Sequence, residues 1–179
     1  AQAAPGCAVT VRYLYQVLRG IPKQFVFAQM LTGFELASRS DSQVVGLNLV
    51  MPEDALVPMR DFSLHMRMLD YLHGLYPKVQ VTLHAGELTP GLVPPEGLRF
   101  HIRESIELGH ATRIGHGVAI MQEDDAVGLL KRMARDKIMV EICLTSNTGI
   151  LGVSGMQHPL ATYLKYGVPT ALATDDEGV

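Results

Sequence analysis

The stretch that decides the fold is Val81-Thr82-Leu83-His84-Ala85-Gly86-Glu87, a short apolar strand that ends in polar side chains. Its alternating aliphatic residues favour extended structure. Gly86 permits a turn that a larger side chain would resist, so His84 and Glu87 can point into one cavity. The C-terminal ends of buried parallel strands are where α/β enzymes hold their catalytic residues. We therefore expect a site at this strand end.

Three more predicted strands end in the same way. They are Arg113-Ile114-Gly115-His116-Gly117, Met139–Cys143 running into Leu144–Asn147, and Thr170–Ala173 running into Thr174-Asp175-Asp176. Any single strand end of this kind is more often structural, since an Asp pair after a strand is commonly a helix cap. Four of them on parallel strands would meet at one edge of the sheet. The candidate constellation is His84, Glu87, His116, Asp175 and Asp176.

The spacing of the strands predicts the architecture. Predicted strands begin near residues 44, 79, 111, 138 and 169, so they recur about every 30 residues, which is typical of βα units. Such units form a parallel sheet with helices outside. With an earlier strand over 9–18 we expect six strands in one domain, residues 1–179. Helices are expected over 23–39, 62–75, 98–108, 123–135 and 159–166, and loops over 88–97 and 148–155.

Composition excludes several classes of function. Hydrophobic residues make up 47% and charged residues 18%, which indicates a globular protein and not a disordered one. The formal net charge of −3 argues against a nucleic-acid partner. No apolar run is long enough for a membrane span. The first six residues lack the features of a signal peptide, but one already removed would leave no trace, so the compartment stays open.

The residue types at the strand ends suit metal-assisted hydrolysis or deamination. His and Asp side chains are ordinary zinc ligands, and zinc lowers the pKa of a bound water to about 7. A nearby Glu can supply or remove a proton. The remaining histidines are assigned to packing, capping or the surface: His65, His73, His101, His110 and His158. The cysteines form no CxxC pair, and Cys143 is expected to be a small core residue.

These motifs, in this order, resemble those of the adenosine deaminase family within the amidohydrolase superfamily. The resemblance runs from about Phe25 to the end of the chain and is carried by Leu83–Glu87, Arg113–Gly117, Ser146-Asn147 and Thr174–Asp176. It implies a (β/α)₈ TIM-type barrel that removes the 6-amino group of a purine nucleoside with Zn²⁺ as cofactor. The implied partner is therefore a small-molecule purine nucleoside.

The resemblance also implies a role for each residue. His84 and Asp175 would ligate zinc. Glu87 would protonate the purine ring nitrogen beside the attacked carbon, and His116 would orient and activate the attacking water. Asp176 would contact that water and the purine.

The resemblance places Met51 and Glu53 on the substrate side of the site. Met51 stands where the family more commonly has a glycine whose backbone would contact the purine. Details of substrate recognition are therefore expected to differ from the family pattern.

Two departures from the family pattern limit the expectation. The chain contains no His-x-His pair, which in the family completes the zinc site from the first strand. A full barrel needs about 250 residues. We therefore expect about six βα units, equivalent to strands three to eight, and little or no activity from the isolated chain.

Two alternatives remain at this point. The substrate could be AMP, adenine or another amino-purine, because the same strand ends would serve the same chemistry. The chain could instead be a complete six-stranded, doubly wound α/β binding module without catalysis. It lacks the G-x-G-x-x-G and phosphate-loop motifs that such modules often carry. The sequence does not predict the oligomeric state.

Overall fold

The computed structural model describes residues 9–175 and contains one parallel sheet of six strands. The strands are β1 (Tyr13–Leu18), β2 (Val44–Val50), β3 (Gln80–Ala85), β4 (Ala111–His116), β5 (Met139–Ile142) and β6 (Thr170–Leu172). They lie side by side in chain order, from β1 to β6, and every neighbouring pair is parallel.

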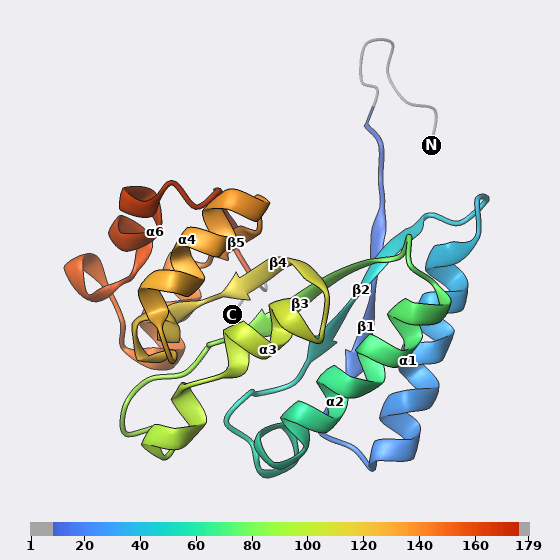
Figure 1. The fold of residues 1–179 in the computed structure, drawn as a ribbon, viewed down its shortest axis with the longest axis horizontal. Helices are drawn as coiled ribbons and strands as arrows, with labels where there is room; N and C mark the ends of the chain where they lie inside the picture. Colours follow the sequence, from blue (N-terminus) through green and yellow to red (C-terminus); the bar gives the residue numbers. More distant parts are fainter. Residues whose placement is uncertain (1–8, 176–179) are drawn as a thin grey trace.

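Helices connect successive strands and cover the outer side of the curved sheet (Figure 1). The α-helices are α1 (Lys23–Ser38), α2 (Leu56–Leu75), α3 (His101–Glu107), α4 (Ala126–Asp136), α5 (Leu144–Leu151) and α6 (Leu160–Tyr166). Short 3₁₀ turns are η1 (Pro95–Leu98), η2 (Val118–Gln122) and η3 (Gly155–Gln157). In the span from 9 to 175, none of these helices has the length and apolarity that crossing a bilayer requires.

The strand order decides between the two predicted architectures. A doubly wound sheet reverses its strand order at a switch point, where the ligand binds. Here the order never reverses, so each unit adds to the same edge, as in a (β/α)₈ barrel. The prediction of six βα units of a TIM-type barrel is confirmed, and the doubly wound module is excluded.

Each strand has one apolar and one polar face, because successive side chains point to opposite sides of a sheet. The outer face packs against the helices through buried residues that include Val17, Leu47, Leu83, Ile114 and Val140. The inner face instead carries Gln16, Asn48, Thr82, Arg113 and Glu141, which line a cavity. The hydrophobic core therefore lies between the sheet and the helices, and the inner face is left for polar chemistry.

The segment after β5 corrects one expectation. A loop was expected over 148–155, but α5 continues to Leu151 and ends at Gly152, which adopts a left-handed φ of 67°. Gly152 donates its N–H to the carbonyls of Asn147 and Thr148, so the helix end is capped. This helix places Ser146 and Asn147 on its first turn, next to the strand ends.

The helix expected over 123–135 begins three residues later than predicted. The helix α4 begins at Ala126, and Asp125 caps it by accepting a hydrogen bond from the N–H of Gly128. Glu123 lies before the helix and is buried, where its carboxylate accepts from the N–H of Ile102. Asp125 therefore caps the helix, whereas Glu123 makes a tertiary contact.

Other predicted bounds shift by a few residues. The first strand begins at Tyr13 and not at Val9, the second helix begins earlier, at Leu56, and α3 begins at His101. The predicted loop over 88–97 ends in the 3₁₀ turn η1.

The close approach of β2 and β3 at Gly46 gives a test of the sheet. A Cβ at Gly46 would lie 2.6 Å from the backbone oxygen of Gln80. We expect Gly46→Ala to lower the free energy of unfolding by about 1–3 kcal/mol, because the strands must separate to admit the methyl group.

The matched control is Gly74→Ala in α2, where nothing lies within 4 Å of the added atom. This change should raise the free energy of unfolding by about 0.4–1 kcal/mol, since alanine restricts the unfolded chain. Urea unfolding of both variants measures the difference. Equal effects at the two positions would contradict the close approach.

Candidate active site

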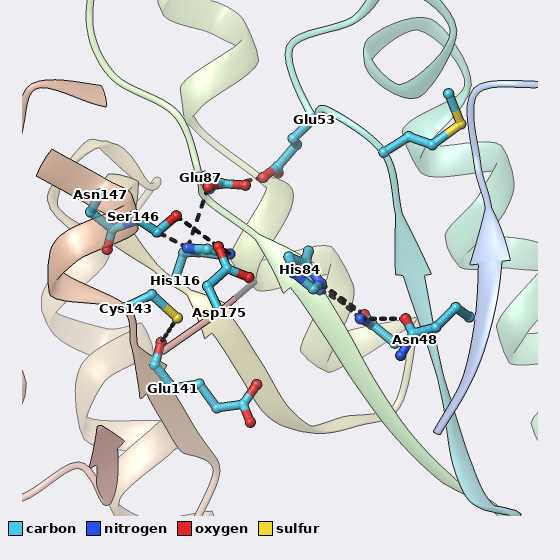
Figure 2. Close-up of polar contacts among 12 residues, drawn as sticks. Asn48, Glu53, His84, Glu87, His116, Glu141, Cys143, Ser146, Asn147 and Asp175 are labelled. Carbon is cyan, nitrogen blue, oxygen red and sulfur yellow. Dashed lines mark hydrogen bonds and ion pairs between the residues drawn. The ribbon is translucent and has the colours of Figure 1, made fainter. Parts of the chain in front are cut away.

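The polar strand ends converge on one cavity. It has a volume of about 1060 Å³ and is lined by residues that follow β2, β3, β4, β5 and β6. His84, Glu87, His116 and Asp175 all line it, and Figure 2 shows their side chains gathered between the strand ends. The structure therefore brings together four of the five predicted constellation residues. The fifth, Asp176, lies outside the described residues.

The turn after β3 carries His84 and Glu87 into the cavity. Gly86 has a φ of 73°, and a Cβ there would lie 2.7 Å from the Cδ1 of Ile102. The neighbouring strand end holds the turn, because the carbonyl of Gly86 accepts from the N–H of Ala119 at 2.9 Å. Only glycine combines this backbone angle with this space.

Three potential metal ligands lie close together. One ligand atom from each of His84, His116 and Asp175 falls within 4.8 Å of the others. They form the single such group in the span from residue 9 to residue 175. His116 and Asp175 both have left-handed backbone angles, with φ of 67° and 64°. Such conformations in non-glycine residues are uncommon and concentrate at functional sites.

His84 is held as a neutral imidazole with one nitrogen already in use. Burial, followed by the charges of His116 and Arg19, lowers its pKa to about 4. Its Nδ1 lies 2.8 Å from the side-chain nitrogen of Asn48 and 3.1 Å from the side-chain oxygen. Asn48 also accepts the backbone N–H of His84 at 3.1 Å. The Nε2 atom is therefore the nitrogen left for a ligand.

Glu87 is a carboxyl group that holds its proton near neutral pH. Burial raises its pKa to about 7, and the charges of Asp175 and Glu53 add to the effect. Its Oε1 is buried and makes no hydrogen bond to any described residue, although it lies 3.4 Å from the Nδ1 of His116. The group can thus donate a proton to a molecule in the cavity.

His116 and Asp175 each have a polar partner on α5. The side-chain nitrogen of Asn147 lies 3.0 Å from the Nδ1 of His116. The hydroxyl of Ser146 donates to Asp175 Oδ2 at 2.7 Å. The ring of His116 lies with its centroid 5.0 Å from that of His84, so the two imidazoles face the same space.

Comparison with known proteins agrees with this geometry. The sequence model of the family described as adenosine deaminase matches residues 1–179. The chain belongs to the adenosine deaminase family.

Several curated proteins of this family are similar to the chain over part of its length. The adenosine deaminase of Yersinia enterocolitica serotype O:8 is 41% identical over 101 residues, which are 56% of this chain and 27% of that protein. The adenosine deaminase of Serratia proteamaculans is 43% identical over 102 residues, with the same coverage of 56% and 27%. That of Escherichia coli strain SE11 is 43% identical over 100 residues. The matched part of the chain thus spans about a quarter of the length of these relatives.

In this adenosine deaminase family member, the carboxylate of Glu53 is hydrogen-bonded to other residues of the chain. Its Oε1 accepts from the N–H of Gly86 at 2.9 Å, and its Oε2 accepts from the N–H of Glu87 at 2.8 Å. Its Oε1 also lies 2.5 Å from the Nδ1 of His101, whose ring stacks on Phe62. Glu53 lines the cavity, but both carboxylate oxygens already hold the turn that carries Glu87.

Met51 has an unusual backbone for its residue type. Its φ is 93°, a conformation that glycine adopts without strain, and this fits the glycine more common in the family. Its carbonyl accepts from the guanidinium of Arg19 at 3.1 and 3.2 Å. Arg19 is buried and also donates to the carbonyl of His84 at 3.1 Å, so it ties three strand ends together.

Sequence reasoning missed several residues around the site: Arg19, Asn48, His101, Asn147 in its contact role, and His158. Arg19 directly follows β1 and precedes Gly20, so the rule that found His84 could have found it too. Asn48 is a polar residue inside an apolar strand, which is a second usable signal. His101 was assigned to packing, and nothing in the sequence links it to Glu53, 48 residues away.

The buried Glu53 predicts how stability depends on pH. Burial alone would raise its pKa, but hydrogen bonding to His101 and the nearby charges lower it from 4.5 to about 2. A lowered folded-state pKa contributes stability above about pH 4.5, and this contribution is lost as the pH falls toward 2. We expect Glu53→Gln to lower the free energy of unfolding at pH 7 by about 3 kcal/mol.

Acid and urea unfolding of the wild type and Glu53→Gln measure this difference. The gap between them should shrink as the pH falls from 4.5 toward 2, because Glu53 takes up a proton in the unfolded wild type over this range while the folded form stays ionised until about pH 2. Glu96→Gln, at an exposed position, is the control and should follow the wild type. A constant gap across this pH range would contradict the role given to the Glu53 charge.

Proposed function

We propose that this chain forms most of the active site of a zinc-dependent hydrolase that deaminates adenosine or a related purine nucleoside. The observation that carries the proposal is the convergence of His84, Glu87, His116 and Asp175 on one cavity in a member of this family. In this reaction water adds to the carbon that bears the 6-amino group, and ammonia leaves. The ring nitrogen beside that carbon takes up a proton.

The donor set supports zinc as the cofactor. His84 and Asp175 would hold the metal, through a neutral imidazole nitrogen and a carboxylate oxygen, which are ordinary zinc ligands. The lowered pKa of His84 keeps its imidazole unprotonated, as ligation requires. When bound, zinc lowers the pKa of a water ligand toward neutrality and so supplies a nucleophile. A catalytic zinc takes three protein ligands, so the complete site needs a ligand beyond these two.

Glu87 would act as the general acid. Its raised pKa leaves a large share of the group protonated near neutral pH, and its buried Oε1 faces the cavity. A carboxyl group in this state can protonate the ring nitrogen as water adds to the neighbouring carbon. The resulting loss of aromatic stabilisation is then offset by relief of negative charge on the ring.

The resemblance assigns the substrate contacts to Asp176, Met51 and Glu53. Asp176 would contact the attacking water and the purine, and the backbone at Met51 would contact the purine. Glu53 would act through the turn that it holds. The cavity volume of about 1060 Å³ is ample for a nucleoside.

The test is deamination of adenosine with and without added Zn²⁺, in the full protein that contains this chain. We expect Glu87→Gln to lower kcat by about a hundredfold to ten-thousandfold, because the variant cannot donate a proton. His84→Ala should abolish the zinc-dependent rate and lower zinc affinity measured by calorimetry. Absence of deamination by the zinc-loaded wild type would overturn the proposal.

Two controls sharpen this test. His110→Ala removes a histidine that pairs with Asp70 outside the cavity, so it should leave the rate unchanged. A panel of adenosine, AMP and adenine separates the nucleoside from the other amino-purines. A faster rate with AMP or adenine would change the proposed substrate but not the proposed reaction.

A further inference from the structure

A chain of hydrogen bonds runs from the start of α6 to the cavity. The backbone N–H of Leu160 donates to the Nδ1 of His158 at 3.1 Å. The Nε2 of His158 lies 3.1 Å from the side-chain oxygen of Asn147, and the side-chain nitrogen of Asn147 lies 3.0 Å from the Nδ1 of His116. All three side chains are buried, with exposed fractions of 3%, 0% and 1%.

The direction of each hydrogen bond follows from its first donor. A backbone N–H can only donate, so the Nδ1 of His158 must present a lone pair. Burial lowers the pKa of His158, which favours the neutral ring. A neutral imidazole with a lone pair on Nδ1 carries its hydrogen on Nε2. His158 therefore donates from Nε2 to the side-chain oxygen of Asn147.

This contact fixes the orientation of the Asn147 amide. With its oxygen facing His158, its NH₂ group faces the Nδ1 of His116 and donates to it. The Nδ1 of His116 is then an acceptor, and the neutral ring carries its hydrogen on Nε2. That nitrogen lies 3.9 Å from Asp175 Oδ2, on the side of the cavity where Ser146 also donates to Asp175.

We infer that Asn147 and His158 are positioning residues that hold His116 in the tautomer with its hydrogen on Nε2. His116 then presents a hydrogen-bond donor to the cavity and is not a third metal ligand, although it lies within reach of His84 and Asp175. The catalytic meaning of this donor rests on the proposed function, whereas the tautomer itself does not.

The opposite tautomer meets a conflict. It would place a hydrogen on the Nδ1 of His116, toward Glu87 Oε1 at 3.4 Å. The Asn147 amide would then have to turn its oxygen to His116 and its NH₂ group to His158. Two donors would face each other at His158 Nε2, inside a buried site where an unmatched polar contact costs about 1–3 kcal/mol.

The tautomer determines what His116 can do in the reaction. A hydrogen on Nε2 can donate to the oxygen of the attacking water and to the oxygen that gains negative charge as the tetrahedral carbon forms. In this form Nε2 has no lone pair with which to take a proton. The ring would thus orient water and stabilise charge while remaining neutral.

The test is the protonation pattern of the histidine rings in the chain labelled with ¹⁵N-histidine. Two-bond ¹⁵N–¹H correlation spectra distinguish the two neutral tautomers, and His116→Gln identifies the signals of His116. We expect the hydrogen on Nε2 in the wild type. In the labelled full protein, addition of Zn²⁺ should shift the signals of His84 and leave the Nε2 hydrogen of His116 in place.

The hydrogen-bonded side chains of His158, Asn147 and His116 form a relay, and variants of its first two members provide the decisive comparison. Asn147→Asp places a carboxylate, which can only accept, against both rings, so His116 should switch to the tautomer with its hydrogen on Nδ1. His158→Gln keeps an N–H donor and should preserve the wild-type tautomer, whereas His158→Phe should give a mixture. His110→Gln, outside the relay, is the control and should leave His116 unchanged.

Several outcomes would overturn the inference. These are a wild-type His116 with its hydrogen on Nδ1, no change of tautomer in a folded Asn147→Asp, and loss of the Nε2 hydrogen when Zn²⁺ binds. If Asn147→Asp does not fold, the pair of His158 variants decides.

Activity is a separate readout in the zinc-loaded full protein. There Asn147→Asp should lower kcat by about a hundredfold to a thousandfold and change KM less. If the tautomers behave as expected but the wild type does not deaminate adenosine, the proposed function fails and the relay stands.

Discussion

The structure depends on satisfying the backbone groups exposed where buried parallel strands end. An unpaired buried N–H or C=O costs free energy comparable to a lost hydrogen bond. Here these groups are satisfied by the side chains of Arg19 and Glu53, which follow β1 and β2. Arg19 donates to two carbonyls, those of Met51 and His84, while Glu53 accepts from the N–H groups of Gly86 and Glu87. The turns that carry the candidate catalytic residues are thus fixed by long-range contacts.

Charge balance beneath the cavity follows from the same contacts. Arg19 is a buried cation. Burial lowers its pKa, whereas the nearby charges of Glu53 and Glu87 raise it and so favour the charged form. It also contributes to the lowered pKa of His84. A single buried guanidinium therefore favours an ionised Glu53 and a neutral His84 together. Isolated charges could not persist at this depth without such partners.

The sequence predicted the framework well because the framework is local and periodic. Recurring apolar segments indicated the strands, and the glycines beside His84 and His116 marked where they end. The partners of these residues were harder to predict. Arg19 contacts a carbonyl 65 positions away, and no local pattern encodes such a pairing. The helix α5 was missed because Gly149 and Gly152 indicated a loop, whereas only Gly152 ends the helix.

The left-handed backbone angles at Met51, His116 and Asp175 have a consequence for how this scaffold can change. Glycine at any of these positions would relieve local strain, so thermal robustness could be gained there by a single substitution. At His116 and Asp175 the same substitution would remove a side chain from the cavity. Met51 also lines the cavity, but its proposed contact with the purine is made by the backbone, which glycine would keep. Met51 is therefore the position where a substitution that raises thermal stability need not lower turnover.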